Sequence, residues 1–161
     1  TALGVDISTA AVAHTARLGG RALCRSFFEP LPGEGRWGTV LLMDGNIGIG
    51  GGPAALPARA AALLAPGGLL LAETAPGDVD ERAEVRVVGS RDALTGGAGQ
   101  SFPWARVGTP ALLRLAGHAG LRALAQWTAG GRSFVALRTR TTRTAAETAN
   151  RAAVISSQWA R

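Results

Sequence analysis

The sequence of 161 residues contains no lysine and no tyrosine, so all 17 of its basic residues are arginines. A Walker A phosphate-binding loop needs a lysine, and Schiff-base and pyridoxal-phosphate chemistry need one too. The missing lysine therefore excludes these classes of enzyme. Because alanine, glycine and arginine are abundant, we interpret the net charge of +6 first as the coding bias of a GC-rich genome, not as a sign of nucleic-acid binding.

Residues that hold metals or form disulfides are also scarce. The single cysteine, Cys24, excludes an intrachain disulfide and a multi-cysteine zinc site, and its place in an apolar segment predicts a small buried side chain. The two histidines, His14 and His118, match no metal-ligand spacing, so we expect no metal site. No apolar run approaches the ~20 residues of a membrane span, and no signal-peptide pattern opens the sequence. We therefore expect a cytoplasmic protein that does not enter a membrane.

The basic charge lies mostly at one end of the sequence. From Ser133 onward there are five arginines and one glutamate, whereas residues 1–132 hold 12 arginines and 10 acidic residues. The first part is therefore close to neutral, which suits a small-molecule ligand better than a polyanion. We expect nucleic-acid binding, if it occurs, to be weak, sensitive to salt and confined to the basic tail.

Apolar periodicity and Gly/Pro signals predict strands that alternate with helices. The predicted strands cover residues 2–5, 22–25, 39–43, 69–73, 84–88, 121–127 and 133–138, and the helices cover 10–18, 53–64 and 109–119. Residues 90–100 read as a loop. This order predicts an α/β, Rossmann-like, doubly wound sheet that is mostly parallel, with one antiparallel strand from the C-terminal hairpin. The continuous apolar runs at 39–43 and 69–73 are typical of strands covered on both faces.

Two aspartates follow predicted parallel strands, where ligands of such sheets bind. Asp6 could accept hydrogen bonds from both hydroxyls of a ribose, or it could simply sit near a helix N-terminus for its dipole. Asp44 is followed by Gly45 and Asn46 in a glycine-rich loop, which could approach a ligand closely or be a plain turn. The sequence contains neither a GxGxxG fingerprint nor the GxSxG motif of hydrolases.

Three segments resemble class I S-adenosylmethionine-dependent methyltransferases, in order and in spacing. Residues 2–12 resemble the second strand and following helix of that family, and residues 36–44 resemble its fourth strand. The most telling segment is 63–71, which resembles the passage from a helix through Leu-x-Pro-Gly-Gly into the fifth strand. The resemblance covers residues 1–138 and implies a seven-stranded sheet that holds the methyl donor S-adenosylmethionine.

The resemblance also implies the roles of individual residues. Asp6 would bind the ribose hydroxyls and Ile7 would pack on the adenine, while Ser26 and Phe27 would approach the adenine edge. Many family members carry an acid at the Ser26 position, so this sequence departs from the pattern there. The methionine part and the methyl group of the donor would lie near three consecutive residues, Asp44, Gly45 and Asn46.

Methyl transfer from a sulfonium donor needs little acid–base equipment beyond alignment of the acceptor. Asp44 is the available carboxylate and our candidate catalytic base, since both histidines fall in predicted helices away from strand ends. Phe102, Trp104 and Arg106 lie in the insert that shapes the acceptor pocket in relatives, although core packing is the simpler role for the two aromatic residues. Trp37 is expected to cover the preceding loop.

The family's first strand and its glycine-rich loop have no counterpart in the sequence, and residue 1 is a threonine. We therefore expect a partial methyltransferase-like domain at 1–138, truncated at its N-terminus and lacking the first strand, and a flexible basic tail at 139–161. Without that strand the chain should be poorly stable.

The function that these observations predict is methyl transfer from S-adenosylmethionine to a small-molecule acceptor. Two alternatives stay open: a methyltransferase-like scaffold that binds no donor, and a nicotinamide-dependent oxidoreductase, in which Asp6 would hold the ribose equally well. Neither the acceptor nor the oligomeric state follows from the sequence.

Overall fold

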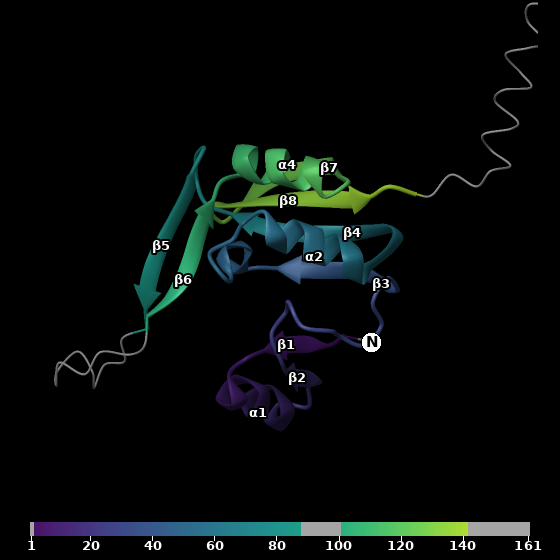
Figure 1. The fold of residues 1–161 in the computed structure, drawn as a ribbon, viewed down its shortest axis with the longest axis vertical. Helices are drawn as coiled ribbons and strands as arrows, with labels where there is room; N and C mark the ends of the chain where they lie inside the picture. The colour runs from purple at the N-terminus through teal and green to yellow at the C-terminus, as the bar shows by residue number, and fades with distance from the viewer. Residues whose placement is uncertain (1, 88–100, 142–161) are drawn as a thin grey trace, which may run out of the picture.

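The computed structural model describes residues 2–87 and 101–141 (Figure 1). The predicted loop at 90–100 and most of the basic tail lie outside the described residues. The elements follow in this order: β1 (Gly4–Asp6), α1 (Thr9–Arg17), β2 (Ala22–Cys24), β3 (Trp37–Leu42), the 3-10 helix η1 (Asn46–Gly48), α2 (Ala55–Leu63), β4 (Leu64–Thr74), β5 (Asp80–Arg86), β6 (Ser101–Val107), α4 (Thr109–His118), β7 (Leu121–Ala129) and β8 (Arg132–Thr139).

A four-stranded sheet in the order β3-β4-β8-β7 forms the body of the molecule. Strands β3 and β4 are parallel, whereas β8 is antiparallel to both β4 and β7. Strand β7 therefore runs in the same direction as β3 and β4, and β8 is the one reversed strand. This arrangement confirms the predicted α/β sheet with one antiparallel strand from a C-terminal hairpin.

Strands β1 and β2 form a separate parallel pair beside α1. Ser8 caps the N-terminus of α1, because its hydroxyl accepts a hydrogen bond from the backbone N–H of Ala11 at 3.2 Å. In Figure 1 the arrows of β1 and β3 point the same way, with a gap between them. No hydrogen-bonded ladder joins β1 to β3 within the described ranges.

The core lies between the four-stranded sheet and helices α2 and α4, which pack against each other as well as on the sheet. Leu70 and Ala72 of β4 are fully buried beneath these helices. Their partners are apolar side chains from the other elements, among them Leu56, Leu112, Val107, Val135 and Leu137. The hairpin of β5 and β6 extends from the carboxyl end of the sheet in Figure 1.

Four local expectations are wrong. Residues 39–43 are not covered on both faces, because Leu41 is 61% exposed, and within residues 2–87 and 101–141 strand β3 is paired with β4 alone. Cys24 is exposed, and among the described strands β2 is paired only with β1. The aromatic cluster at 102–104, where no strand was expected, belongs to strand β6, which pairs with β5. Strand β4 begins at Leu64, ahead of the predicted strand at 69–73, and its pairing with β3 shifts register between Trp37 and Thr39.

No helix in the described part of the chain is both long and apolar enough to cross a membrane.

Candidate functional site

Asp6 is the last residue of β1 and Asp44 follows the carboxyl end of β3, two strands that point to the same side of the molecule (Figure 1). The Asp6 Oδ1 atom accepts a hydrogen bond from the backbone N–H of Ser8 at 2.7 Å. This bond holds the carboxylate at the N-terminal end of α1. The neighbouring Ile7 is 77% exposed, which leaves an apolar surface beside the carboxylate.

Ser26 and Phe27 lie on the same side, just beyond β2. The backbone N–H of Ser26 donates to the Glu29 carboxylate at 2.8 Å, and its hydroxyl accepts from the N–H of Phe28 at 3.2 Å. Phe27 packs against the edge of the core. The polar atoms of Ser26 that these bonds involve are engaged within the loop, so its approach to an adenine remains a prediction.

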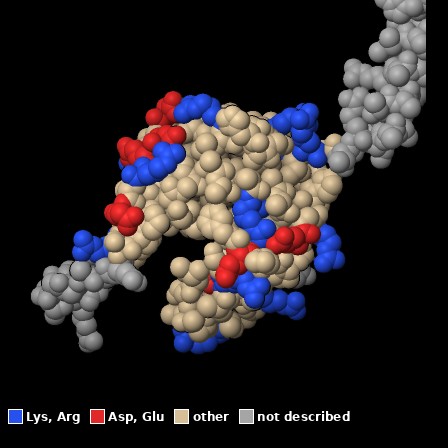
Figure 2. Space-filling model, in the orientation of Figure 1, with Lys and Arg blue, Asp and Glu red and all other residues tan. Residues whose placement is uncertain are grey.

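A groove of about 760 Å³ separates β1 from β3, and its mouth is the indentation between the two parts of the molecule in Figure 2. Val5 of β1 and Val40 of β3 line it, as do Phe27, Asn46 and Ile49. The groove thus connects the Asp6 side of the molecule with the loop that begins at Asp44.

Asp44 lies in a cluster of charges that the sequence did not reveal. Arg132, at the start of β8, donates to the Asp44 carboxylate at 2.5 Å and to Glu73 Oε1 of β4 at 2.8 Å. The backbone N–H of Asp44 donates to the same Glu73 carboxylate at 2.6 Å. Asp44 has the left-handed backbone angle φ 54°, which is uncommon for a residue with a side chain. Arg132 therefore competes with any acceptor for the Asp44 carboxylate.

The cluster also sets the charge of Glu73. The hydrogen bond from Arg132 lowers the pKa of Glu73 below its ordinary value, with a smaller contribution from the Asp44 N–H, while partial burial acts in the opposite direction. The same contacts raise the pKa of Arg132. Glu73 is therefore an anion at neutral pH, and its side chain is only 15% exposed beside the loop that follows β3.

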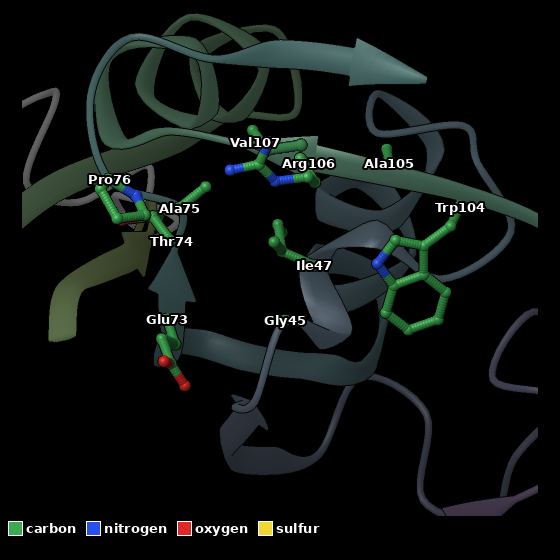
Figure 3. A pocket seen from close by; sticks show the side chains of 10 residues that line it. All are labelled: Gly45, Ile47, Glu73, Thr74, Ala75, Pro76, Trp104, Ala105, Arg106 and Val107. Carbon is green, nitrogen blue, oxygen red and sulfur yellow. The ribbon is translucent and has the colours of Figure 1, made fainter. Parts of the chain in front are cut away.

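A second, smaller cavity of about 230 Å³ lies at the carboxyl end of β4 (Figure 3). Figure 3 shows Ile47 near its centre, Glu73 at one side, Trp104 at the opposite side and Arg106 above Ile47, beside Val107. Gly45 also lines it. Two members of the predicted acceptor insert, Trp104 and Arg106, thus line this cavity, whereas Phe102 is not among its lining residues.

The sequence reasoning missed Glu73 and Arg132. Glu73 carried the signal that drew attention to Asp6 and Asp44, an acid at the end of an apolar strand, but it was read as part of that strand. Arg132 carried no such signal, because the β7–β8 hairpin alone brings it to the site.

Trp37 packs on the preceding loop as expected, where its indole N–H donates to the Pro32 carbonyl at 2.8 Å. Within residues 2–87 and 101–141, no cluster of His, Cys, Asp and Glu side chains could hold a metal ion.

No protein-family model matches the sequence, and no curated protein matches it. The fold, in contrast, is shared with solved methyltransferases. The 1,6-didemethyltoxoflavin-N1-methyltransferase of Burkholderia thailandensis, solved with its substrate and S-adenosylhomocysteine, matches with a TM-score of 0.56 and 16% identity over 86% of this chain and 60% of its own. A methyltransferase of Bacteroides fragilis in complex with S-adenosylhomocysteine matches with a TM-score of 0.61 and 18% identity over 84% of this chain and 62% of its own.

The sugar N-methyltransferase KedS8 of Streptoalloteichus matches with a TM-score of 0.59 and 17% identity, over 86% of this chain and 70% of its own. The chain therefore has the fold of S-adenosylmethionine-dependent methyltransferases, as the sequence resemblance implied. It spans less than two thirds of the length of the Burkholderia and Bacteroides proteins.

Proposed function

We propose that the chain forms part of an S-adenosylmethionine-dependent methyltransferase that acts on a small-molecule acceptor. The observation that carries this proposal is the methyltransferase fold with Asp6 and Asp44 at the carboxyl ends of two strands that flank one groove. The solved proteins of this fold with bound S-adenosylhomocysteine support the choice of donor.

The exposed residues at the end of β1 fit the nucleoside part of such a donor. The Asp6 carboxylate is exposed and fixed in position by the Ser8 N–H, so it can accept hydrogen bonds from a ribose diol. Ile7 offers an exposed aliphatic surface next to it, which suits the face of an adenine. When bound, the donor supplies a methyl group already activated on a sulfonium.

The acceptor, in this proposal, occupies the cavity lined by Ile47, Trp104 and Arg106. Its volume of about 230 Å³ is below the usual range of ~300–1,000 Å³ for ligand pockets, which favours a small acceptor. The Trp104 ring can stack on a flat molecule. Glu73, ionised and at the cavity wall, can accept a proton or hold a cationic group, and it joins Asp44 as a candidate for this role.

Titration calorimetry with S-adenosylhomocysteine tests the proposal. We expect heat of binding from the 161-residue chain. If no heat of binding is measured, the enzyme proposal fails.

One observation favours the alternative of a donor-free scaffold. Asp44 is already paired with Arg132, and the backbone N–H of Ser26 is bonded within its own loop. A scaffold would show no donor binding in the same titrations while keeping its fold by circular dichroism.

A further inference from the structure

The cavity at the carboxyl end of β4 combines mostly apolar walls with one embedded carboxylate (Figure 3). Glu73 and Arg106 are the two charged residues that line it. The other lining residues are uncharged, and all but one of them are apolar or glycine: Gly45, Ile47, Thr74, Ala75, Pro76, Trp104, Ala105 and Val107. The charges of Glu73 and Arg106 therefore decide which ligands the cavity prefers.

Arg106 contributes little to the charge inside the cavity. Its side chain is 59% exposed, and its Nη1 atom donates to the Glu81 carboxylate of β5 at 2.9 Å. The charge of such an exposed ion pair is compensated by the partner and screened by water and salt. Glu73 differs, because only 15% of its side chain is exposed. Its negative charge is screened less and acts on whatever occupies the cavity.

Arg132 offsets only part of the negative charge beside the cavity. Its guanidinium is shared between Glu73 and Asp44, so one positive charge faces two negative charges. The Asp44 side chain is 81% exposed and hydrated, which leaves Glu73 as the carboxylate that a ligand in the cavity meets. Within residues 2–87 and 101–141, Glu73 Oε1 accepts one hydrogen bond and Oε2 accepts two. A carboxylate has about four acceptor positions, so Oε1 can accept one more donor.

This setting suits Glu73 to hold a cation. The hydrogen bond from Arg132 lowers the pKa of Glu73 below its ordinary value, so the group is a weak base at neutral pH. A hydrogen bond between a cationic N–H and a carboxylate is roughly twice as strong as one between neutral groups. The apolar walls favour an apolar body on the same molecule. A neutral molecule of equal shape would gain less, and an anion would be repelled.

We propose that this cavity selects a flat molecule with a cationic nitrogen, an aromatic ring that carries an ammonium or amidinium group, and that Glu73 binds this nitrogen. The inference rests on the proposed function, for which it names the class of acceptor. The cationic nitrogen serves for recognition and is not the methylated atom, because a protonated amine has no lone pair to attack the methyl group. The acceptor atom therefore lies elsewhere on the molecule.

Three molecules of nearly equal shape test this preference for a cation. Benzamidine is a cation, benzamide is neutral and benzoate is an anion. Each is titrated without methyl donor into the 161-residue chain, and the NMR signals of the Ile47 methyl groups and the Trp104 indole N–H report binding in the cavity. We expect benzamidine to bind about tenfold more tightly than benzamide, and benzoate to bind more weakly than either. Equal affinities, or a preference for benzoate, would overturn the proposal.

Glu73→Gln keeps the size of the side chain and removes its charge, so it should abolish the preference for benzamidine over benzamide. Glu84→Gln is the matched control, because it removes an exposed carboxylate of β5 that is not among the lining residues. It should keep the tenfold preference, as should Arg106→Gln. A preference that survives in Glu73→Gln, or is lost in either of the other two variants, would contradict the role of Glu73. If circular dichroism shows that Glu73→Gln does not fold, the three titrations of the unmodified chain still decide the proposal.

A separate titration with S-adenosylhomocysteine distinguishes a failure of this proposal from a failure of the proposed function. Preference for benzamidine without binding of S-adenosylhomocysteine would leave the cation site standing and reject the methyltransferase. Binding of S-adenosylhomocysteine without any preference among the three molecules would reject the cation site and leave the methyltransferase standing.

Discussion

Arg132 donates from Nε to the Oε1 atom of Glu73 at 2.8 Å, across two neighbouring strands and 59 residues of sequence. The register of β4 and β8 explains the contact, because Thr74 lies opposite Ser133 and so places Arg132 beside the carboxyl end of β4. The same guanidinium reaches Asp44 at the end of β3. One arginine thus links the carboxyl ends of two parallel strands.

Replacement of Arg132 by glutamine should raise the pKa of Glu73 toward its ordinary value, because its main hydrogen-bond donor is lost. Glu73 has a lowered pKa in the folded state, so the stabilisation that it contributes is complete above its ordinary pKa of 4.5 and is lost as the pH falls through the folded value. The stability gap between wild type and variant should therefore be widest above pH 4.5 and close in more acidic solution. NMR titration of the Glu73 carboxyl and denaturant melts across pH measure both effects.

Arg122→Gln provides the control for that experiment, since Arg122 is an exposed arginine of β7 and its removal changes the net charge equally. It should leave the pKa of Glu73 in place. An equal shift in both variants would mean that overall charge, not the contact with Arg132, sets the titration.

Gly48→Ala should destabilise the fold by about 1–3 kcal/mol, the range for overpacked sites. A Cβ atom at Gly48 would lie 2.0 Å from the Ala105 carbonyl oxygen and 2.7 Å from Trp104 Nε1, so η1 and β6 would have to separate. Gly117→Ala in α4 is the matched control, because its Cβ would meet nothing within 4 Å and the change should stabilise the helix by roughly 0.5–1 kcal/mol. Urea denaturation of both variants decides the matter, and similar stability for the two would contradict the close packing of η1 on β6.

Arg59→Lys should loosen the segment at 27–34. The Arg59 guanidinium of α2 donates to the carbonyls of Phe27 at 3.0 Å and Glu29 at 2.6 Å, and to the Glu34 carboxylate at 2.6 Å. A lysine lacks this fork geometry, so we expect a loss of roughly 1 kcal/mol for each carbonyl bond that it fails to replace. Faster amide exchange in 27–34 is the readout. Arg114→Lys, at an exposed ion pair with Asp78, should not produce it.

Asp6→Ala should weaken the binding of S-adenosylhomocysteine by about tenfold, equivalent to ~1.4 kcal/mol, if Asp6 accepts from a ribose. Asp80→Ala removes another exposed carboxylate, in β5, and should leave the affinity unchanged. Calorimetry with S-adenosylhomocysteine on the wild type and both variants measures this difference in affinity. Full affinity in Asp6→Ala would confine Asp6 to its bond with Ser8.

Local signals in the sequence carried much of the fold. The apolar runs, the Ser8 cap and the glycines after the helices fixed the alternation of strands and helices, since each acts through neighbouring backbone groups. The short segment between the predicted strands at 121–127 and 133–138 likewise indicated the hairpin that supplies the antiparallel strand. Strand β6 was not predicted, because its pairing with β5 depends on a partner strand.

Only part of the candidate site could be predicted from the sequence. Asp6 and Asp44 could be selected because a strand followed by an acid is a local pattern, and the structure places them at one side of the molecule. Their roles as donor and base residues remain predictions. Glu73 and Arg132 emerged from the register of β4 and β8, which no stretch of neighbouring residues encodes.

The scarcities of the sequence, no lysine and one cysteine, determined by themselves which chemistries these 161 residues cannot supply, because a missing side chain cannot be supplied by folding. The apolar pattern determined the order of most of the helices and strands, β6 excepted. The tertiary structure alone decided that Arg132 would bridge two carboxylates and that an uncharged groove would separate β1 from β3. Both depend on which strands pair, and strand pairing is settled by contacts between residues that are distant in the sequence.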